Sequence, residues 1–180
     1  APALMPLAKS GEAPLRIVAV HALAAAGGPD ALAAVKAAVE DKEDAVQDEA
    51  VRSLSTWANK WPEDAGVMEP LLALAKDGKK PAHKILGLRG YLEAIQAAKA
   101  LDGDAKLAKV NGVMALITRP EEKKIVVAVL GNIATAGALD MLVGLAAEAA
   151  IAEEASAAIV ALASRGDVKG ATKEQRQKAL

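Results

Sequence analysis

Apolar residues recur along most of the chain at the three- and four-residue spacing of a single helix face. Each such stretch predicts an amphipathic helix with one buried side, and the short connections require neighbouring helices to pack antiparallel as hairpins. The stretches contain Leu32, Val35 and Val39; Ala50, Leu54 and Trp57; Ile85, Leu88, Leu92 and Ile95; Leu107, Val110, Met114 and Ile117; Val126, Val129, Leu130 and Ile133; and Ile151, Ala155, Ala158 and Leu162.

Prolines and glycines mark where these helices begin and end. Proline stands shortly before several of the stretches, where its missing N–H costs nothing, and glycine follows them, as it does in left-handed helix caps. We expect a helix that either begins at Pro70 or is kinked there. Because the first hairpin is incomplete, we expect the chain to be part of a larger protein. The predicted repeat domain is 1–166, with hairpins at about 3–26, 29–59, 62–98, 104–134 and 137–164, followed by a polar tail or short capping helix at 167–180.

The chain also contains an internal repeat. The segment Leu7–Pro14 matches Leu74–Pro81, 67 positions later. This displacement is about two repeat lengths of a solenoid, whose repeats are typically about 20–50 residues long. The sequence therefore predicts an all-α fold, an α-α superhelix (solenoid) of about five antiparallel helical hairpins. A leucine in the predicted second helices recurs at intervals of 31, 38, 38 and 32 residues, at Leu23, Leu54, Leu92, Leu130 and Leu162.

The segment Val46–Leu54, which follows the acidic turn Glu40–Asp44, resembles a HEAT repeat. The alternation of helix, turn and second helix is similar to HEAT and armadillo repeats, and closer to HEAT because two helices per unit suffice. The resemblance covers nearly the whole chain and implies that the second helices line the concave surface. Residues 149–152 depart from it because they carry no turn signal. The last hairpin is therefore either one bent helix or a pair that turns through alanine-rich sequence. Residues 86–92 also resemble repeats in large bacterial proteins, many of them exported.

Composition supports closely packed helices. Hydrophobic residues make up 53% of the chain, with no Phe, one Tyr and two Trp. The formal net charge of −1 lacks the basic excess of nucleic-acid-binding proteins, so nucleic acid is disfavoured as a partner. No apolar run approaches the roughly 18 residues of a membrane span, which predicts a soluble chain without membrane insertion, either cytoplasmic or exported to a periplasm. The absence of Cys excludes disulfides and thiolate chemistry.

No residue pattern predicts catalysis, a cofactor or a metal. The two histidines, His21 and His83, fall in different repeats without a second ligand one turn away. His21 shares a helix face with Ile17, Val20 and Ala24, which indicates a partly buried packing residue. The adjacent carboxylates at 121–122 and 153–154 point about 100° apart on their helices, unlike a catalytic dyad. We therefore expect a protein that is not an enzyme.

One set of residues is a candidate partner-binding site. His21, Arg52 and Arg89 occupy matching positions in three successive second helices, so they would form a row that an extended peptide could follow. The alternative is an internal role, in which each basic residue bonds to an acid or carbonyl of a preceding turn, for example Arg52 to Asp44. Trp61 and Tyr91 are candidate aromatic anchors, whereas Trp57 belongs to a buried stripe.

Two charge clusters have a similar pair of interpretations. Residues 40–49 carry six acids and one lysine, whereas Lys80 and Lys84 belong to a basic group between 76 and 89. They are either solvated turns or a polarised surface that steers a partner of mixed charge. The predicted partner-binding residues are His21, Arg52, Arg89, Trp61, Tyr91, Lys80 and Lys84.

The function predicted from these features is a non-catalytic module that binds a protein or peptide, or acts as a scaffold. An enzyme is the alternative, because HEAT-like chains include bilin lyases and DNA glycosylases. Few aromatic residues and a near-neutral charge count against both enzymes. A structural spacer between the domains of a longer protein is the third possibility.

Overall fold

The computed structural model describes residues 2–180, and the side chains from residue 3 onward. This part of the chain has eleven α-helices, four short 3₁₀-helices and no β-strand. The predicted fold class, an all-α solenoid of helical hairpins, is confirmed. The chain divides into two compact units, Ala1–Lys99 and Ala100–Leu180, which are described separately. The division into one repeat domain, 1–166, and a tail stays a prediction.

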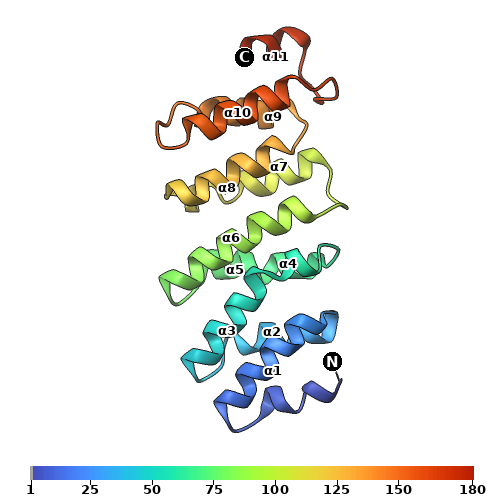
Figure 1. Cartoon of the computed structure of the whole chain (residues 1–180), viewed down its shortest axis with the longest axis vertical. Coiled ribbons are helices and arrows are strands. Elements are labelled where there is room, and N and C mark those ends of the chain that lie inside the picture. Colours follow the sequence, from blue (N-terminus) through green and yellow to red (C-terminus); the bar gives the residue numbers. More distant parts are fainter. Residues whose placement is uncertain (1) are drawn as a thin grey trace. The chain divides into compact units, whose positions relative to one another are not determined.

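In the first unit the second helices of successive hairpins pack side by side. α1 packs against α3 and α3 against α6, while the first helices α2 and α5 pack beside them. Figure 1 shows α2 behind α1 and α3, and α5 behind α6. The elements are η1 Pro2–Leu4, η2 Leu7–Lys9, α1 Ala13–Ala26, α2 Pro29–Ala38, α3 Asp44–Ser55, α4 Trp57–Lys60, η3 Ala65–Val67, α5 Met68–Asp77 and α6 Pro81–Ala97.

Pro70 illustrates how the local sequence suits the fold. α5 begins at Met68, two residues earlier than the predicted start at Pro70. Pro70 lies in the first helical turn, whose N–H groups have no intrahelical partner, so its missing N–H removes no hydrogen bond. The proline therefore sits in the helix without requiring a kink.

The second unit uses the same helix pairs. α8 packs against α9 and α10, and α11 packs against α10. α9 ends at Leu145 and α10 begins at Ala152, so the last pair turns through alanine-rich sequence and is not one bent helix. The turn is fixed by Ile151, which is fully buried and whose N–H donates to the Glu148 carbonyl. The elements are α7 Gly103–Asn111, η4 Met114–Leu116, α8 Pro120–Gly131, α9 Ala136–Leu145, α10 Ala152–Ala163 and α11 Lys173–Ala179.

The recurring leucine of the second helices lies in the core of each unit. Leu23, Leu54 and Leu92 are fully buried in the first unit, and Leu130 and Leu162 are fully buried in the second. Burial of one such side chain contributes about 1.5–3 kcal/mol. The repeat seen in the sequence is therefore the repeat of the hydrophobic core.

Two glycines let α6 approach its neighbours closely. A Cβ atom at Gly90 would lie 2.7 Å from the Cα atom of Ser55 in α3, and one at Gly87 would lie 2.6 Å from Cβ of Leu74 in α5. Any side chain at these positions would meet backbone or core atoms. α6 is therefore packed against both helices at a separation that only glycine permits.

A largely buried ion pair joins Arg16, near the start of α1, to Asp41, in the turn before α3. The Arg16 guanidinium donates from Nε and Nη2 to the two carboxylate oxygens of Asp41, each at 2.8 Å. Nη1 of Arg16 also donates to the carbonyl oxygens of Ser10 and Gly11. The hydrogen bonds from Arg16 hold the pKa of Asp41 below its ordinary value. The pair therefore ties the turn before α3 to the start of α1.

We expect Asp41→Asn to be less stable than the wild type at pH 7, with a difference that shrinks on acidification. A carboxyl whose pKa is lowered in the folded state stabilises the protein above its unfolded pKa of about 4, and that stabilisation is lost as the pH falls through the folded pKa. Urea unfolding between pH 7 and pH 3 measures the difference. Asp30→Asn, at an exposed position with no ion pair among residues 2–180, is the matched control. A constant difference down to pH 3 would contradict the expectation.

Candidate partner-binding site

Two of the three row residues lie together around one carboxylate. His21 of α1 places Nδ1 2.9 Å from Oε1 of Glu49, and Arg52 of α3 donates from Nη1 to Oε2 of the same residue at 2.7 Å. The side chains of His21 and Arg52 are 70% and 65% exposed, whereas Glu49 is largely buried. The predicted burial of His21 is therefore wrong. The predicted pairing of Arg52 with Asp44 is also wrong, because the partner of Arg52 is Glu49, one turn earlier on its own helix.

These side chains surround a pocket of about 250 Å³ on the surface of the second helices. Its apolar part includes Trp57, a buried ring whose Nε1–H donates to Asp64 at 3.1 Å. Polar groups of α3 and the exposed Lys60 form the rest of the wall. The pocket therefore joins an apolar base to exposed cationic groups. It is lined by His21, Ala24, Glu49, Arg52, Ser53, Thr56, Trp57 and Lys60.

The third row residue lies outside this pocket. Arg89 is half-buried on α6 and does not contribute to the pocket wall. One turn further along α6, Glu93 accepts a hydrogen bond from Asn59 of α4 at 3.1 Å. The structure therefore brings His21 and Arg52 together but does not place Arg89 with them.

The two predicted charge clusters pair with each other. Lys79 lies 2.5 Å from Glu40, and Lys80 lies 2.7 Å from Asp48 and 3.4 Å from Asp44. The hydrogen bond from Lys80 is the main cause that lowers the pKa of Asp48, and it raises the pKa of Lys80 in turn. Three of the six acids, one before α3 and two in its first turns, are therefore paired with the basic turn before α6. Lys84, the other predicted residue of this group, is exposed on α6.

Neither predicted aromatic anchor is a fully exposed side chain. Trp61 is half-buried, and its Nε1–H donates to the Ala24 carbonyl oxygen at 3.1 Å. Its ring lies against Gly27, where an added Cβ would come within 2.3 Å of Cε2. Tyr91 is buried, and this burial raises its pKa. Both rings therefore contribute to packing, as Trp57 does, although Trp61 is the most exposed of the three.

Comparison with known proteins supports the same architecture. Residues 1–85 match the family profile "HEAT repeats". This part of the chain is therefore similar to HEAT repeats, as the sequence pattern predicted. A crystal structure of an engineered protein, solved by the Northeast Structural Genomics Consortium, is similar over 98% of this chain and 92% of its own, with 21% identity and a TM-score of 0.53. At this level of identity the similarity concerns the fold alone. No curated protein matches the chain.

The pocket at His21 and Arg52 lies entirely within the matched HEAT repeats, since its lining extends from residue 21 to residue 60. HEAT repeats are generally protein-interaction or scaffold modules, which agrees with the predicted class of function. Among the described residues, no group of three or more His, Asp or Glu side chains is placed to hold a metal ion. The helices between residues 2 and 180 are all too short or too polar to span a membrane.

Sequence reasoning missed the residue at the centre of the site. In the sequence Glu49 is one of six acids between residues 40 and 49, yet in the structure it bonds to both His21 and Arg52. Its spacing of three residues before Arg52 is that of neighbours on a helix surface, so this pair was detectable. The contact with His21 was not, because it depends on how α1 packs against α3. Ser53, Thr56 and Lys60 had no distinguishing signal.

Proposed function

We propose that the HEAT repeats at the start of the chain bind an acidic group of a protein or peptide partner in the pocket between α1 and α3. The observation that carries the proposal is the exposure of His21 and Arg52 around one pocket, each held in place by Glu49. Because both bond to Glu49, the His21 ring and the Arg52 guanidinium are held in place, and the exposed part of each can contact a partner. No catalytic step is part of this proposal.

The charge balance of the pocket supports an acidic occupant. Arg52 and Lys60 each carry a positive charge, while Glu49 is the acid among the lining residues. A guanidinium has five N–H donors, and one of those of Arg52 is used by Glu49, which leaves others to bind a carboxylate. Lys60 has no ion pair among residues 2–180. The pocket therefore keeps a positive excess despite its own carboxylate.

The apolar part of the pocket supports a peptide rather than a free ion. Ala24 and Trp57 line the base but are only 5% and 1% exposed. The accessible carbon surface therefore comes from the exposed Arg52, Thr56 and Lys60. A glutamate or aspartate side chain in a peptide, with an apolar neighbour, would use both kinds of surface. A simple anion would use the charged groups alone. Arginine clusters that capture acidic motifs are a common mode of peptide recognition.

Fluorescence anisotropy with three labelled octapeptides tests this proposal. In each peptide leucine alternates with glutamate, lysine or serine. We expect the glutamate peptide to bind most tightly, and Arg52→Glu with Lys60→Glu to weaken it by about 10-fold or more, because two charge-assisted contacts become repulsive. Lys42→Glu with Lys76→Glu makes the same charge change at exposed residues outside the pocket and is the matched control.

A further variant, Arg89→Glu, decides whether the surface extends to α6. Weaker binding by this variant would show that the predicted row of three residues acts together, whereas unchanged binding would confine the site to the pocket. Circular dichroism melts of all variants check that folding is intact. Equal affinity for the three peptides, or equal loss in the control variant, would overturn the proposal.

A further inference from the structure

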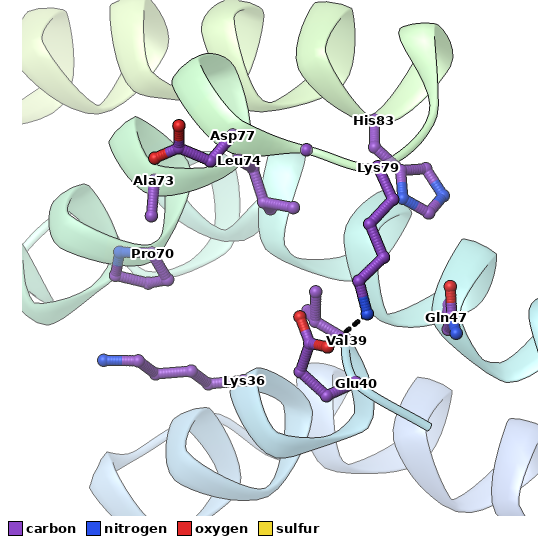
Figure 2. Close-up of a pocket in the computed structure, with 11 residues that line it drawn as sticks. Lys36, Val39, Glu40, Gln47, Pro70, Ala73, Leu74, Asp77, Lys79 and His83 are labelled. Carbon is purple, nitrogen blue, oxygen red and sulfur yellow. Dashed lines mark hydrogen bonds and ion pairs between the residues drawn. The ribbon is translucent and has the colours of Figure 1, made fainter. Parts of the chain in front are cut away.

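A second pocket lies on the other layer of the HEAT repeats, between the first helices α2 and α5. Its volume is about 270 Å³, and it shares no lining residue with the pocket at His21 and Arg52. Figure 2 shows α5 side chains on one side of the space, Lys36 to Glu40 on the other, and His83 and Gln47 at one end. It is therefore a separate candidate site.

The walls of this pocket are largely apolar. Pro70, Ala73 and Leu74 lie at the three- and four-residue spacing of one face of α5, and Val39 follows the last turn of α2. Ala73 is exposed, so its small side chain leaves the pocket open to solvent on the α5 side. These apolar side chains would therefore pack against the carbon atoms of a bound molecule.

The charged groups at the mouth of the pocket are mostly paired within the protein. Lys79 bonds to Glu40 at 2.5 Å, the contact drawn as a dashed line in Figure 2, and Lys36 bonds to Glu69 at 2.7 Å. Paired charges offer a charged ligand little net attraction. Asp77, the other charged lining residue, is exposed and has no ion pair among residues 2–180, so the rim repels an anion and imposes no charge repulsion on a neutral occupant.

His83 supplies one free hydrogen-bonding atom at the inner end of the pocket. Its side chain is 5% exposed, and Nε2 lies 2.7 Å from Oδ1 of Asp48. A carboxylate only accepts, so in the neutral ring Nε2 carries the hydrogen and Nδ1 is an acceptor. Nδ1 has no hydrogen-bond partner among the described residues. Every fully buried side-chain nitrogen among these residues does have a partner. Nδ1 is therefore not fully enclosed, and the His83 ring lies at one end of this pocket (Figure 2).

We propose that this pocket receives one tyrosine or tryptophan side chain of a protein partner, with its O–H or N–H donating to Nδ1 of His83. The volume is just below that of ordinary drug-sized sites, about 300–1,000 Å³, and suits a single ring. The apolar walls contact the ring faces, and the ring's polar atom satisfies the histidine. Phenylalanine would cover Nδ1 without bonding to it, which carries a desolvation cost. Tyrosine and tryptophan are also the commonest anchors of protein interfaces. This inference does not depend on the proposed function of the first pocket.

NMR titration of the full chain at pH 8, where an ordinary imidazole is neutral, tests the inference. The probes are N-acetyl-tyrosinamide, N-acetyl-tryptophanamide and N-acetyl-phenylalaninamide, with p-cresol as a free phenol. We expect the first two to shift the methyl signals of Val39 and Leu74 and the ring signals of His83 saturably. N-acetyl-phenylalaninamide should bind about 2- to 10-fold more weakly, the effect of one neutral hydrogen bond.

A filled pocket provides the matched variant. Ala73→Phe places a ring in the pocket from an exposed helical position and should abolish the saturable shifts, whereas Ala37→Phe, at an exposed alanine of α2 outside the pocket, should retain them. Measurements on the wild-type protein suffice to overturn the inference: equal affinity for the tyrosine and phenylalanine probes, or no saturable shift at Leu74, would do so. Binding of p-cresol without binding of N-acetyl-tyrosinamide would assign the pocket to a free small molecule and overturn the protein partner.

Discussion

Leu92→Ala is expected to lower the free energy of unfolding by about 2–5 kcal/mol, the range found when a buried leucine is truncated and leaves a cavity. Leu92 is fully buried on α6, which packs against α3 on one side and α5 on another. Because the core of a repeat unit is shared only between neighbouring helices, few other contacts can compensate for a cavity there. Urea unfolding followed by circular dichroism measures the change.

Leu15→Ala is the control for this truncation. Leu15 lies on α1 and is 40% exposed, so the same atoms are removed where no closed cavity can form. We expect a loss below about 1 kcal/mol, since surface substitutions usually have small effects. Similar losses for Leu92 and Leu15 would show that the assigned core is wrong.

Gly90→Ala is expected to destabilise the protein by about 1–3 kcal/mol, although alanine is the better helix former by about 1 kcal/mol. The new Cβ would lie 2.7 Å from Cα and 2.8 Å from the carbonyl oxygen of Ser55, and backbone atoms of α3 cannot yield as a flexible side chain would. α6 would have to move away from α3. Overpacking therefore outweighs the gain in helix propensity.

Gly144→Ala tests the same substitution without the clash. Gly144 lies in the last turn of α9, and a Cβ there would meet no atom within 4 Å. We expect Gly144→Ala to stabilise the protein by up to about 1 kcal/mol, since only the backbone effect remains. Thermal and urea unfolding of both variants should give changes of opposite sign. Two changes of the same sign would argue against the close approach of α6 and α3.

The sequence was sufficient to predict the helical hairpins and the recurring core leucines, but not every helix end: Met114 and Ile117, placed on the same helix face as Leu107, lie beyond the end of α7 at Asn111. The spacing that places Leu54 and Leu92 on apolar faces depends only on the geometry of one helix, and both leucines are fully buried in the structure. The turn before Ile151 does not follow from the sequence, because alanine has no strong preference at a helix end. A buried side chain after the turn, and not a glycine or proline, fixes the chain there.

The side-chain pairs could not be predicted from single helices. His21 lies at the edge of an apolar face, and the neighbouring helix decides that it turns out toward Glu49. His83 is the buried histidine, because the first turns of α3 supply Asp48 as its partner. Trp61 is covered because Gly27 leaves room for its ring. Each of these results depends on the offset between adjacent repeats, which the period of the sequence does not specify.

The ion pairs between successive hairpins have a consequence for how this chain can evolve. Lys80 and His83 of one hairpin meet Asp48 of the one before, and in the second unit Lys123 and Lys124 meet Glu148 and Glu154. A hairpin that was duplicated or transferred to another place would face residues that do not match its charges. The ion pairs between neighbouring repeats therefore favour the present order of the repeats. Neighbouring repeats keep these pairs only when they are exchanged or redesigned together.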